Sequence, residues 1–299
     1  MVEHSLGKGE ATCSIHVKGT IFPSPVCPDL ADAFSAPLAI IACCNHPPAP
    51  AVATSSLHSP VWLFDLDNTL HDASHAIFPA ISANMNTYIA RVLSAGGVPA
   101  TQAMVDAARL GYWKRYGATL LGMMRHHQVC AADFLRETHD IGPLEALLRS
   151  ERGLGRLLRR LPGRKILLTN APNSYSTEIV RRMKLHNHFS HHVAIEHMHV
   201  HGQLRPKPSK LMLRRLLRKH GVAAHRCILV EDTLANLRTA RQLGLRTVWV
   251  TQYLRMSDPI GKAPLPRTLK CPGYVNVKVK SVRQLPTRLS RLRETNKND

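Results

Sequence analysis

Five short apolar runs, each followed by polar residues, constrain the fold of this 299-residue chain more than any other feature. They lie at residues 61–67, 165–170, 192–196, 227–232 and 246–251. Helix-like stretches separate the last four runs, at residues 174–185, 209–220 and 234–243. A short apolar run of this kind is typical of a strand that is buried on both faces of a parallel sheet. Strands that alternate with helices predict an α/β fold with a doubly wound parallel sheet.

The connection between the first and second predicted strands is far longer than a crossover helix requires. Residues 79–161 carry helical patterns and no convincing strand, and the predicted helices span 79–95, 102–116, 118–128, 131–137 and 144–161. We therefore predict an all-helical cap inserted after the first strand. It would lie over the carboxyl edge of the sheet, where open α/β folds bind their ligands.

The flanking segments differ from this pattern. Residues 1–59 lack periodicity and are rich in Pro, Ala, Ser and Cys, so we expect a disordered extension there. The predicted core comprises residues 60–78 and 162–262. Residues 263–299 would form a basic segment with an edge strand over 274–280, a helix over 281–293 and a tail. The seven cysteines include no Cys-x-x-Cys pair, and no apolar run is long enough to cross a bilayer. A cytoplasmic protein with no membrane contact is the expectation.

Acidic residues follow the first predicted strand. Asp65 and Asp67 are two positions apart, so on an extended strand their side chains point the same way. Two neighbouring carboxylates repel each other unless a cation intervenes. Mg²⁺ prefers oxygen ligands and is often bound by one or two carboxylates together with phosphate. The spacing therefore favours a Mg²⁺ site.

The ends of other predicted strands carry residues suited to binding phosphate or a cation. The second strand ends in Thr169-Asn170, whose hydroxyl and amide could hold phosphoryl oxygens. The fourth ends in Glu231-Asp232, a second acidic pair suited to a hard cation. Lys207 lies in a proline-flanked loop before a helix and supplies a compact positive charge. In this order the residues describe a phosphoryl-transfer site.

The order resembles that of the haloacid dehalogenase superfamily of phosphatases over roughly residues 61–255. The resemblance rests on Asp65-Leu-Asp-Asn-Thr, Leu168-Thr-Asn, Lys207-Pro and Val230-Glu-Asp-Thr with Asn236. It implies that Asp65 is the nucleophile, that Asp67 is the general acid and base, and that Thr169 and Lys207 hold the phosphoryl group. It also implies Mg²⁺ ligation by Asp65, by the backbone carbonyl of Asp67 and by Asp232. Glu231 is a weaker candidate, because many relatives carry Asp or Gly there.

Within the superfamily, the segments around Phe64–His71 and Tyr112–Thr119 look like the pyrimidine 5′-nucleotidase branch. The implied substrates are UMP- and CMP-like nucleotides. Residues expected to bind substrate are Thr69, Asn170, Tyr112, Trp113, Tyr116 and Arg125. The aromatic rings offer faces for a base and the guanidinium offers donors for a phosphate or carbonyl group. Another small phosphate ester, such as phosphoglycolate or a sugar phosphate, is the alternative substrate.

A different class of function is suggested by the charge. Lys and Arg total 40 against 20 Asp and Glu, a net charge of +20. Such a field attracts polyanions, so a non-catalytic nucleic-acid-binding protein on this scaffold is a second hypothesis. No recognised nucleic-acid-binding motif accompanies the charge, and binding alone does not require both Asp65 and Asp67. A small-molecule phosphate ester is the expected partner, and the sequence leaves the oligomeric state open.

Overall fold

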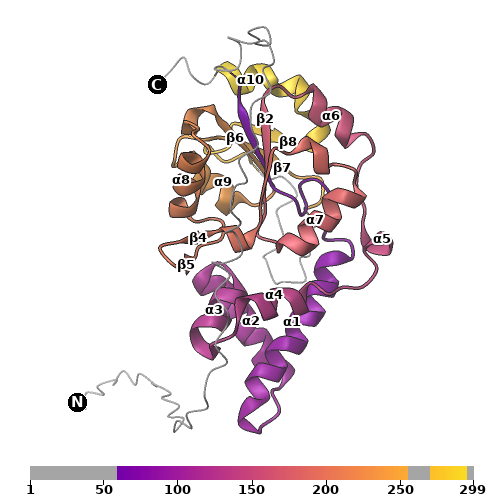
Figure 1. Ribbon diagram of the computed structural model, residues 1–299, viewed down its shortest axis with the longest axis vertical. Coiled ribbons are helices and arrows are strands. Elements are labelled where there is room, and N and C mark those ends of the chain that lie inside the picture. The colour runs from indigo at the N-terminus through magenta and orange to yellow at the C-terminus, as the bar shows by residue number, and fades with distance from the viewer. Residues whose placement is uncertain (1–58, 255–269, 295–299) are drawn as a thin grey trace, which may run out of the picture. The chain divides into compact units, whose positions relative to one another are not determined.

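Six parallel strands form the central sheet of the computed structural model, which describes residues 59–254 and 270–294 (Figure 1). They are β1 (Val61–Phe64), β2 (Arg164–Leu168), β3 (His191–Val193), β6 (Cys227–Glu231), β7 (Arg246–Val250) and β8 (Val277–Val279). Their order across the sheet is β3-β2-β1-β6-β7-β8, and every pairing is parallel. The predicted fold class is confirmed. The predicted extension at residues 1–59 lies outside the described residues except for Ser59.

Helices cover both faces of the sheet because alternate strand residues point to opposite sides. Leu63 belongs to an apolar cluster with α8 (Lys210–Lys219) and α9 (Leu234–Arg241). Its neighbours Trp62 and Phe64 belong to a second cluster, on the other face. The helices of that cluster are α6 (Leu154–Arg160), α7 (Asn173–Arg182) and α10 (Leu289–Glu294). Strands buried from both sides explain why these runs are continuously apolar.

Local sequence signals define both ends of helix α8. The Ser209 hydroxyl accepts a hydrogen bond from the backbone N–H of Met212 and caps α8, as a serine before an apolar-periodic segment predicts. Gly221 follows the helix with a left-handed φ of +60°. Before α8, β4 (His199–Val200) and β5 (Gln203–Leu204) form a short antiparallel pair.

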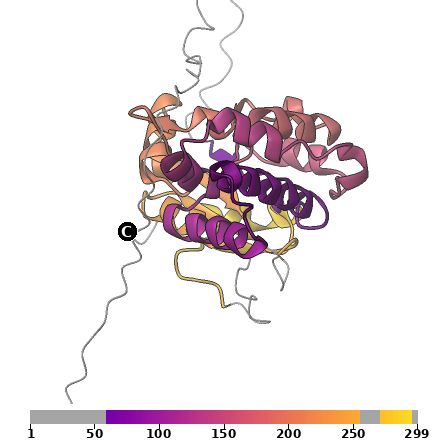
Figure 2. The same cartoon turned by 90° about the horizontal axis from the view of Figure 1, so that it is seen from below.

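The first helices between β1 and β2 pack on one another beyond the strands (Figures 1 and 2). They are α1 (Ile77–Leu93), α2 (Gln102–Tyr116), α3 (Thr119–His127) and α4 (Ala131–Thr138). The single turn α5 (Leu144–Leu147) and then α6 follow them before β2. The helix predicted over residues 144–161 is wrong. The chain leaves the helical conformation after α5 and resumes it only at α6, following Gly153 with φ of +81°. Leucine spacing alone does not reveal this break.

The segment between α5 and α6 pairs with the chain that leaves β1. The backbone N–H of Asp72 donates to the carbonyl of Arg149 over 2.7 Å, and His71 and Ser150 form an antiparallel bridge. These two segments, residues 71–72 and 149–150, connect the cap helices to the sheet. No helix in the described part of the chain combines the length and apolarity required to cross a membrane.

The C-terminal elements are shorter than predicted. The edge strand expected over residues 274–280 is β8, and the helix expected over 281–293 begins only at Leu289. Two 3₁₀ turns precede it, at Val282–Gln284 and Pro286–Arg288. Pro286 cannot donate a backbone hydrogen bond, which explains why a continuous α-helix does not form through this segment. Residues 263–269 and 295–299 of the predicted C-terminal segment lie outside the described residues.

The order of the strands in the sheet indicates where a functional site is expected. From β1 the chain continues to β2 and β3 on one side and then returns to β6 on the other. The carboxyl ends of β1 and β6 therefore flank the point where the direction of winding reverses. Open α/β folds bind ligands at such a point.

Gly163 provides a test of the α6–β2 connection. It has a φ of +83°, and a Cβ placed there would lie 2.0 Å from the carbonyl oxygen of Pro60. We expect Gly163→Ala to lower the free energy of unfolding by about 2–4 kcal/mol, through backbone strain and overpacking together. Gly221→Ala is the matched control, since φ is +60° but no atom lies within 4 Å of the added methyl. Urea denaturation of both variants measures the difference, and equal losses would contradict the prediction.

Candidate active site

Asp65 directly follows β1 and continues its pairing with β6, because its backbone N–H donates to the Val230 carbonyl over 3.0 Å. The next residues turn sharply. Asn68 adopts a left-handed φ of +60°, a conformation that Asn tolerates better than most residues. Its side-chain amide bonds to both the hydroxyl and the backbone N–H of Ser74. The turn brings Thr69 back toward the strand end, and its hydroxyl donates to Oδ2 of Asp65 over 2.8 Å.

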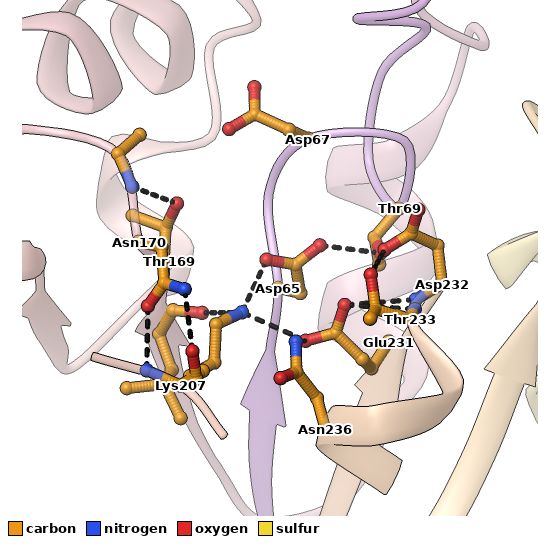
Figure 3. A network of polar contacts seen from close by, with 12 residues as sticks. Asp65, Asp67, Thr69, Thr169, Asn170, Lys207, Glu231, Asp232, Thr233 and Asn236 are labelled. Atoms are coloured by element: carbon orange, nitrogen blue, oxygen red, sulfur yellow. Dashed lines mark hydrogen bonds and ion pairs between the residues drawn. The ribbon is translucent and has the colours of Figure 1, made fainter. Parts of the chain in front are cut away.

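Lys207 lies against the other oxygen of Asp65 (Figure 3). Its Nζ donates to Oδ1 of Asp65 over 2.6 Å, to Oε2 of Glu231 over 2.8 Å and to the Leu168 carbonyl over 3.0 Å. The side-chain amide of Asn170 fixes the Lys207 backbone, accepting from its N–H and donating to its carbonyl. Burial opposes the charge on Lys207, but the charges of Asp65 and Glu231 outweigh burial and raise its pKa. The ammonium group therefore stays charged in this pocket.

The acidic pair at the end of β6 completes the arrangement. Carboxylate oxygens of Asp65, Glu231 and Asp232 all lie within 4.8 Å of one another. Glu231 uses both of its oxygens: one accepts from Lys207 and Asn236, and the other from the backbone N–H groups of Asp232 and Thr233. Asp232 accepts from the Thr233 hydroxyl, and its own carbonyl accepts from the Trp249 indole. Glu231 thus acts as the partner of Lys207 and Asn236.

Crowding of these carboxylates shifts their proton affinities. Burial and the charge of Glu231 raise the pKa of Asp65 to about 7, against the lowering effect of Lys207. Burial also opposes the ionised form of Glu231, but Lys207 and the hydrogen bonds from the β6–α9 turn lower the pKa of Glu231. The protein therefore holds one carboxyl group in an environment that favours its neutral form until another cation approaches. An all-oxygen donor set with this excess of negative charge fits Mg²⁺.

Asp67 takes a different position (Figure 3). Its Oδ1 accepts from the Tyr175 hydroxyl over 2.7 Å and lies 3.0 Å from Nε2 of His71, so its carboxylate is not part of the three-acid cluster. Burial would raise the pKa of Asp67, but the hydrogen bonds from His71 and Tyr175 and the charge of His71 outweigh it and lower that pKa. The expected contribution of Asp67 to a metal site is through its backbone carbonyl.

Sequence reasoning missed the role of Tyr175. This residue is in the first turn of α7, the helix that follows Thr169 and Asn170. A polar aromatic side chain in the first turn after such a strand end is a signal that could have been used. The hydroxyl of Thr169 itself accepts from the backbone N–H of Ala171 over 3.0 Å.

A cavity of about 310 Å³ lies between this cluster and the cap helices. The predicted site residues that line it are Asp65, Asp67, Trp113, Thr169, Asn170, Lys207, Glu231 and Asp232. Arg109 also lines it and was not predicted. Arg109 and Trp113 are four positions apart on α2 and therefore share one face of the helix. That face meets the cavity.

Tyr112, Tyr116 and Arg125 are not among the residues that line this cavity. The hydroxyl of Tyr112 lies 2.7 Å from Nε2 of His127, and that of Tyr116 lies 2.6 Å from Nε2 of His126. Arg125 stands over the Tyr116 ring at 5.9 Å. These contacts join α2 to α3. Thr69 reaches the site only through its bond to Asp65.

Comparison with known proteins gives one family match and several similar solved structures. The family model described as haloacid dehalogenase-like hydrolase matches residues 61–244. A solved HAD phosphatase from Thermococcus onnurineus has 12% sequence identity and a TM-score of 0.52, with 77% of this chain and 97% of that one covered. CbbY from Rhodobacter sphaeroides, solved with phosphate, has 18% identity and a TM-score of 0.48, with 76% and 96% covered. An L-2-haloacid dehalogenase from Xanthobacter autotrophicus has 14% identity and a TM-score of 0.46, with 78% and 98% covered.

Proposed function

The chain belongs to the haloacid dehalogenase-like hydrolases, and on that premise we propose that it hydrolyses phosphate monoesters with the help of Mg²⁺. One observation carries the proposal. A buried carboxylate, Asp65, is held between Lys207 and Thr69 at the end of β1, and it faces a cavity whose other side is lined by the cap helices. A nucleophile fixed at both oxygens and shielded from bulk water is suited to covalent catalysis.

In the proposed reaction an oxygen of Asp65 attacks phosphorus and forms an aspartyl-phosphate as the bond to the ester oxygen breaks. Asp67 gives a proton to the departing alkoxide and then removes one from the water that attacks phosphorus. That second attack releases inorganic phosphate and restores the Asp65 carboxylate. Lys207 and Thr169 hold the phosphoryl oxygens and offset their charge. When bound, Mg²⁺ would supply further positive charge to the phosphoryl group, and Asp65, Asp232 and the Asp67 carbonyl would hold it.

Asp67 favours phosphate esters over carbon–halogen bonds as the substrate. A halide leaves as a stable anion and needs no proton, whereas an alkoxide does. The Tyr175 and His71 contacts keep the Asp67 side chain ordered at the cavity wall. They favour its ionised form, which is the form that removes a proton from water, and the proton taken up in that step is the one Asp67 gives to the next alkoxide. The arrangement therefore supports phosphatase chemistry.

The reaction class is tested with the purified full chain. We expect phosphate release from p-nitrophenyl phosphate in the presence of Mg²⁺, abolished by EDTA, and no halide release from 2-chloropropionate. Halide release without phosphatase activity would overturn the proposal in favour of a dehalogenase.

We further propose a pyrimidine 5′-nucleotide as the substrate. The cavity of about 310 Å³ is at the small end of the range for ligand sites, which suits a mononucleotide with a single-ring base. From α2, Trp113 offers an aromatic face for the base and Arg109 offers hydrogen-bond donors for its carbonyl groups.

Substitution of Trp113 separates this substrate from smaller esters. We expect Trp113→Ala to raise KM for UMP by about tenfold, the loss expected for a base that no longer stacks. KM for phosphoglycolate should change little, since that ester has no base. Tyr116→Ala is the matched control, because this ring is on the same helix but does not line the cavity. Phosphoglycolate turnover equal to or above that of UMP in the unmodified protein would refute the nucleotide assignment.

Mg²⁺ should stabilise the fold in a pH-dependent way. The pKa of Asp65 is raised to about 7 in the metal-free folded protein, where the carboxyl group keeps its proton, whereas in the unfolded chain this group has its ordinary pKa of 3.8. Stability from this group therefore falls as pH rises from about 4 to 7. Metal binding requires the ionised carboxylate, so the rise in Tm on adding Mg²⁺ should be larger at pH 8 than at pH 5.5.

Thermal unfolding with and without excess EDTA measures this effect. Glu137→Gln is a control, because this carboxylate pairs with Arg91 on the exposed surface of the cap and should leave the Mg²⁺ effect unchanged. A Mg²⁺-induced rise in Tm that is equal at both pH values would contradict the assignment of Asp65 as a ligand.

A further inference from the structure

A second cavity, of about 520 Å³, lies beside α6 and the C-terminal end of α7. Its lining is strongly basic, with Arg152, Arg156, Arg159, Arg182 and Lys184, and we call these five residues the basic groove. It shares no lining residue with the active-site cavity. The groove is therefore a separate feature that the proposed reaction does not use.

Most of this charge has no acidic partner. Arg182 pairs with Glu178 and Glu145. Across the part of the chain that the structure describes, no carboxylate lies within ion-pair distance of the other four cations of the basic groove. The single acid in the lining, Glu151, accepts a hydrogen bond from the Ser281 hydroxyl. Like charges gathered around one hollow repel one another, and an anion bound there would relieve that repulsion.

The hydrogen-bond donors of the basic groove indicate which kind of anion it would bind. Guanidinium groups present planar pairs of N–H donors that match phosphate oxygens, and three of the unpaired cations are Arg. A single phosphate cannot contact four separated side chains well, whereas a chain of phosphates can. Among the lining residues the only ring is the imidazole of His188, which lies 3.5 Å from a guanidinium nitrogen of Arg159. Single-stranded nucleic acids usually stack their bases on aromatic side chains, and the groove offers no such surface.

We propose that the basic groove binds a small molecule that carries several phosphate groups and is recognised through those phosphates. The site is distinct from the active-site cavity and does not depend on the reaction proposed above. Arg152 lies in the chain just before α6, and Arg156 and Arg159 are on the exposed side of that helix. Lys184 lies in the chain just after α7, so the ligand would join these two elements.

Inorganic tripolyphosphate is the probe, in isothermal titration calorimetry with the full chain in EDTA and 150 mM salt (a level at which purely nonspecific attraction is screened, roughly an 8 Å Debye length). The test variant is Arg152→Ala/Arg156→Ala/Lys184→Ala. The control variant is Arg214→Ala/Arg218→Ala/Lys219→Ala, which removes the same charge from exposed positions on α8. We expect the first variant to weaken binding by about tenfold or more, and the second by less than about twofold.

Equal weakening by the two variants, or no measurable binding by the unmodified protein, would overturn the proposal. A 12-nucleotide single-stranded RNA serves as the competing ligand. If the RNA binds more tightly than tripolyphosphate and loses affinity in the groove variant alone, the groove is an RNA site and the small-molecule proposal fails. Thermal melts of both variants check that each is folded, which the exposure of all six side chains leads us to expect.

Discussion

Replacement of Asp65 by asparagine should lower kcat for every phosphate ester by at least about 10⁴-fold, comparable to the loss of a nucleophile in other covalent enzymes. An amide is not a nucleophile toward phosphorus. The fold should survive, since the amide oxygen still accepts a hydrogen bond from Lys207 and the Thr69 hydroxyl accepts one from the new N–H group. Loss of the charge also removes the repulsion from Glu231. The variant should be inactive and no less stable than the unmodified protein at pH 8.

A neighbouring substitution provides the comparison. Asp67→Asn should greatly slow the attack of Asp65 on UMP, whose alkoxide needs a proton, and should slow the attack on p-nitrophenyl phosphate far less, because the phenolate leaves unaided. Hydrolysis of the aspartyl-phosphate, in which Asp67 is the base, should be slowed equally for both substrates, so rapid-mixing measurement of the first turnover distinguishes the two roles. Residual activity of Asp65→Asn within tenfold of the unmodified protein would exclude Asp65 as the nucleophile.

Replacement of Lys207 by methionine should be the most destabilising change at the site. It leaves the buried carboxylates of Asp65 and Glu231 without their shared cation, and loss of one partner of a buried ion pair costs about 3–5 kcal/mol. The loss should be smaller at pH 5, where Asp65 binds a proton because its pKa is raised to about 7. Urea denaturation at pH 5 and pH 8 measures both values.

A second substitution and a control sharpen this test. Glu231→Gln combined with Lys207→Met should recover part of the lost stability but no activity, because the phosphoryl contact of Lys207 is still missing. Lys165→Met is the control: this half-buried lysine donates to the Leu161 carbonyl and has no ion pair within the described residues. A loss at Lys165 as large as at Lys207 would show that general packing, not charge, explains the effect.

The convergence of Asp65 and Asp232 was predictable because parallel strands present their carboxyl ends at one edge of a sheet. Lys207 joins them from the loop that precedes α8. The cap residues that line the cavity were less predictable. Tyr112 and Trp113 are adjacent on α2, and adjacent helical residues point about 100° apart, so only one of them can face the cavity. Because aromatic residues lie on more than one side of α2, tertiary packing decides which of them lines the cavity. In the structure Trp113 lines it, together with Arg109 one turn earlier in the helix.

Side-chain partners at the site were the least predictable. The partnership of Asp67 with Tyr175 joins residues 108 positions apart and depends on where α7 begins. The break between α5 and α6 likewise depends on pairing with residues 71–72, a long-range contact that the leucine pattern of residues 144–161 does not encode. Local periodicity in the sequence predicts the helices and strands. These contacts depend on the tertiary structure and cannot be predicted from that periodicity.

The backbone pairing of residues 71–72 with 149–150 has a consequence for how the cap can open. Both connections between the cap helices and the sheet run through these two segments, and hydrogen bonds join one to the other. If the cap moves while this pairing holds, the two segments must move together and act as one hinge. His71 belongs to the pairing and its Nε2 lies 3.0 Å from Oδ1 of Asp67, so such a motion would also reach the proposed proton donor.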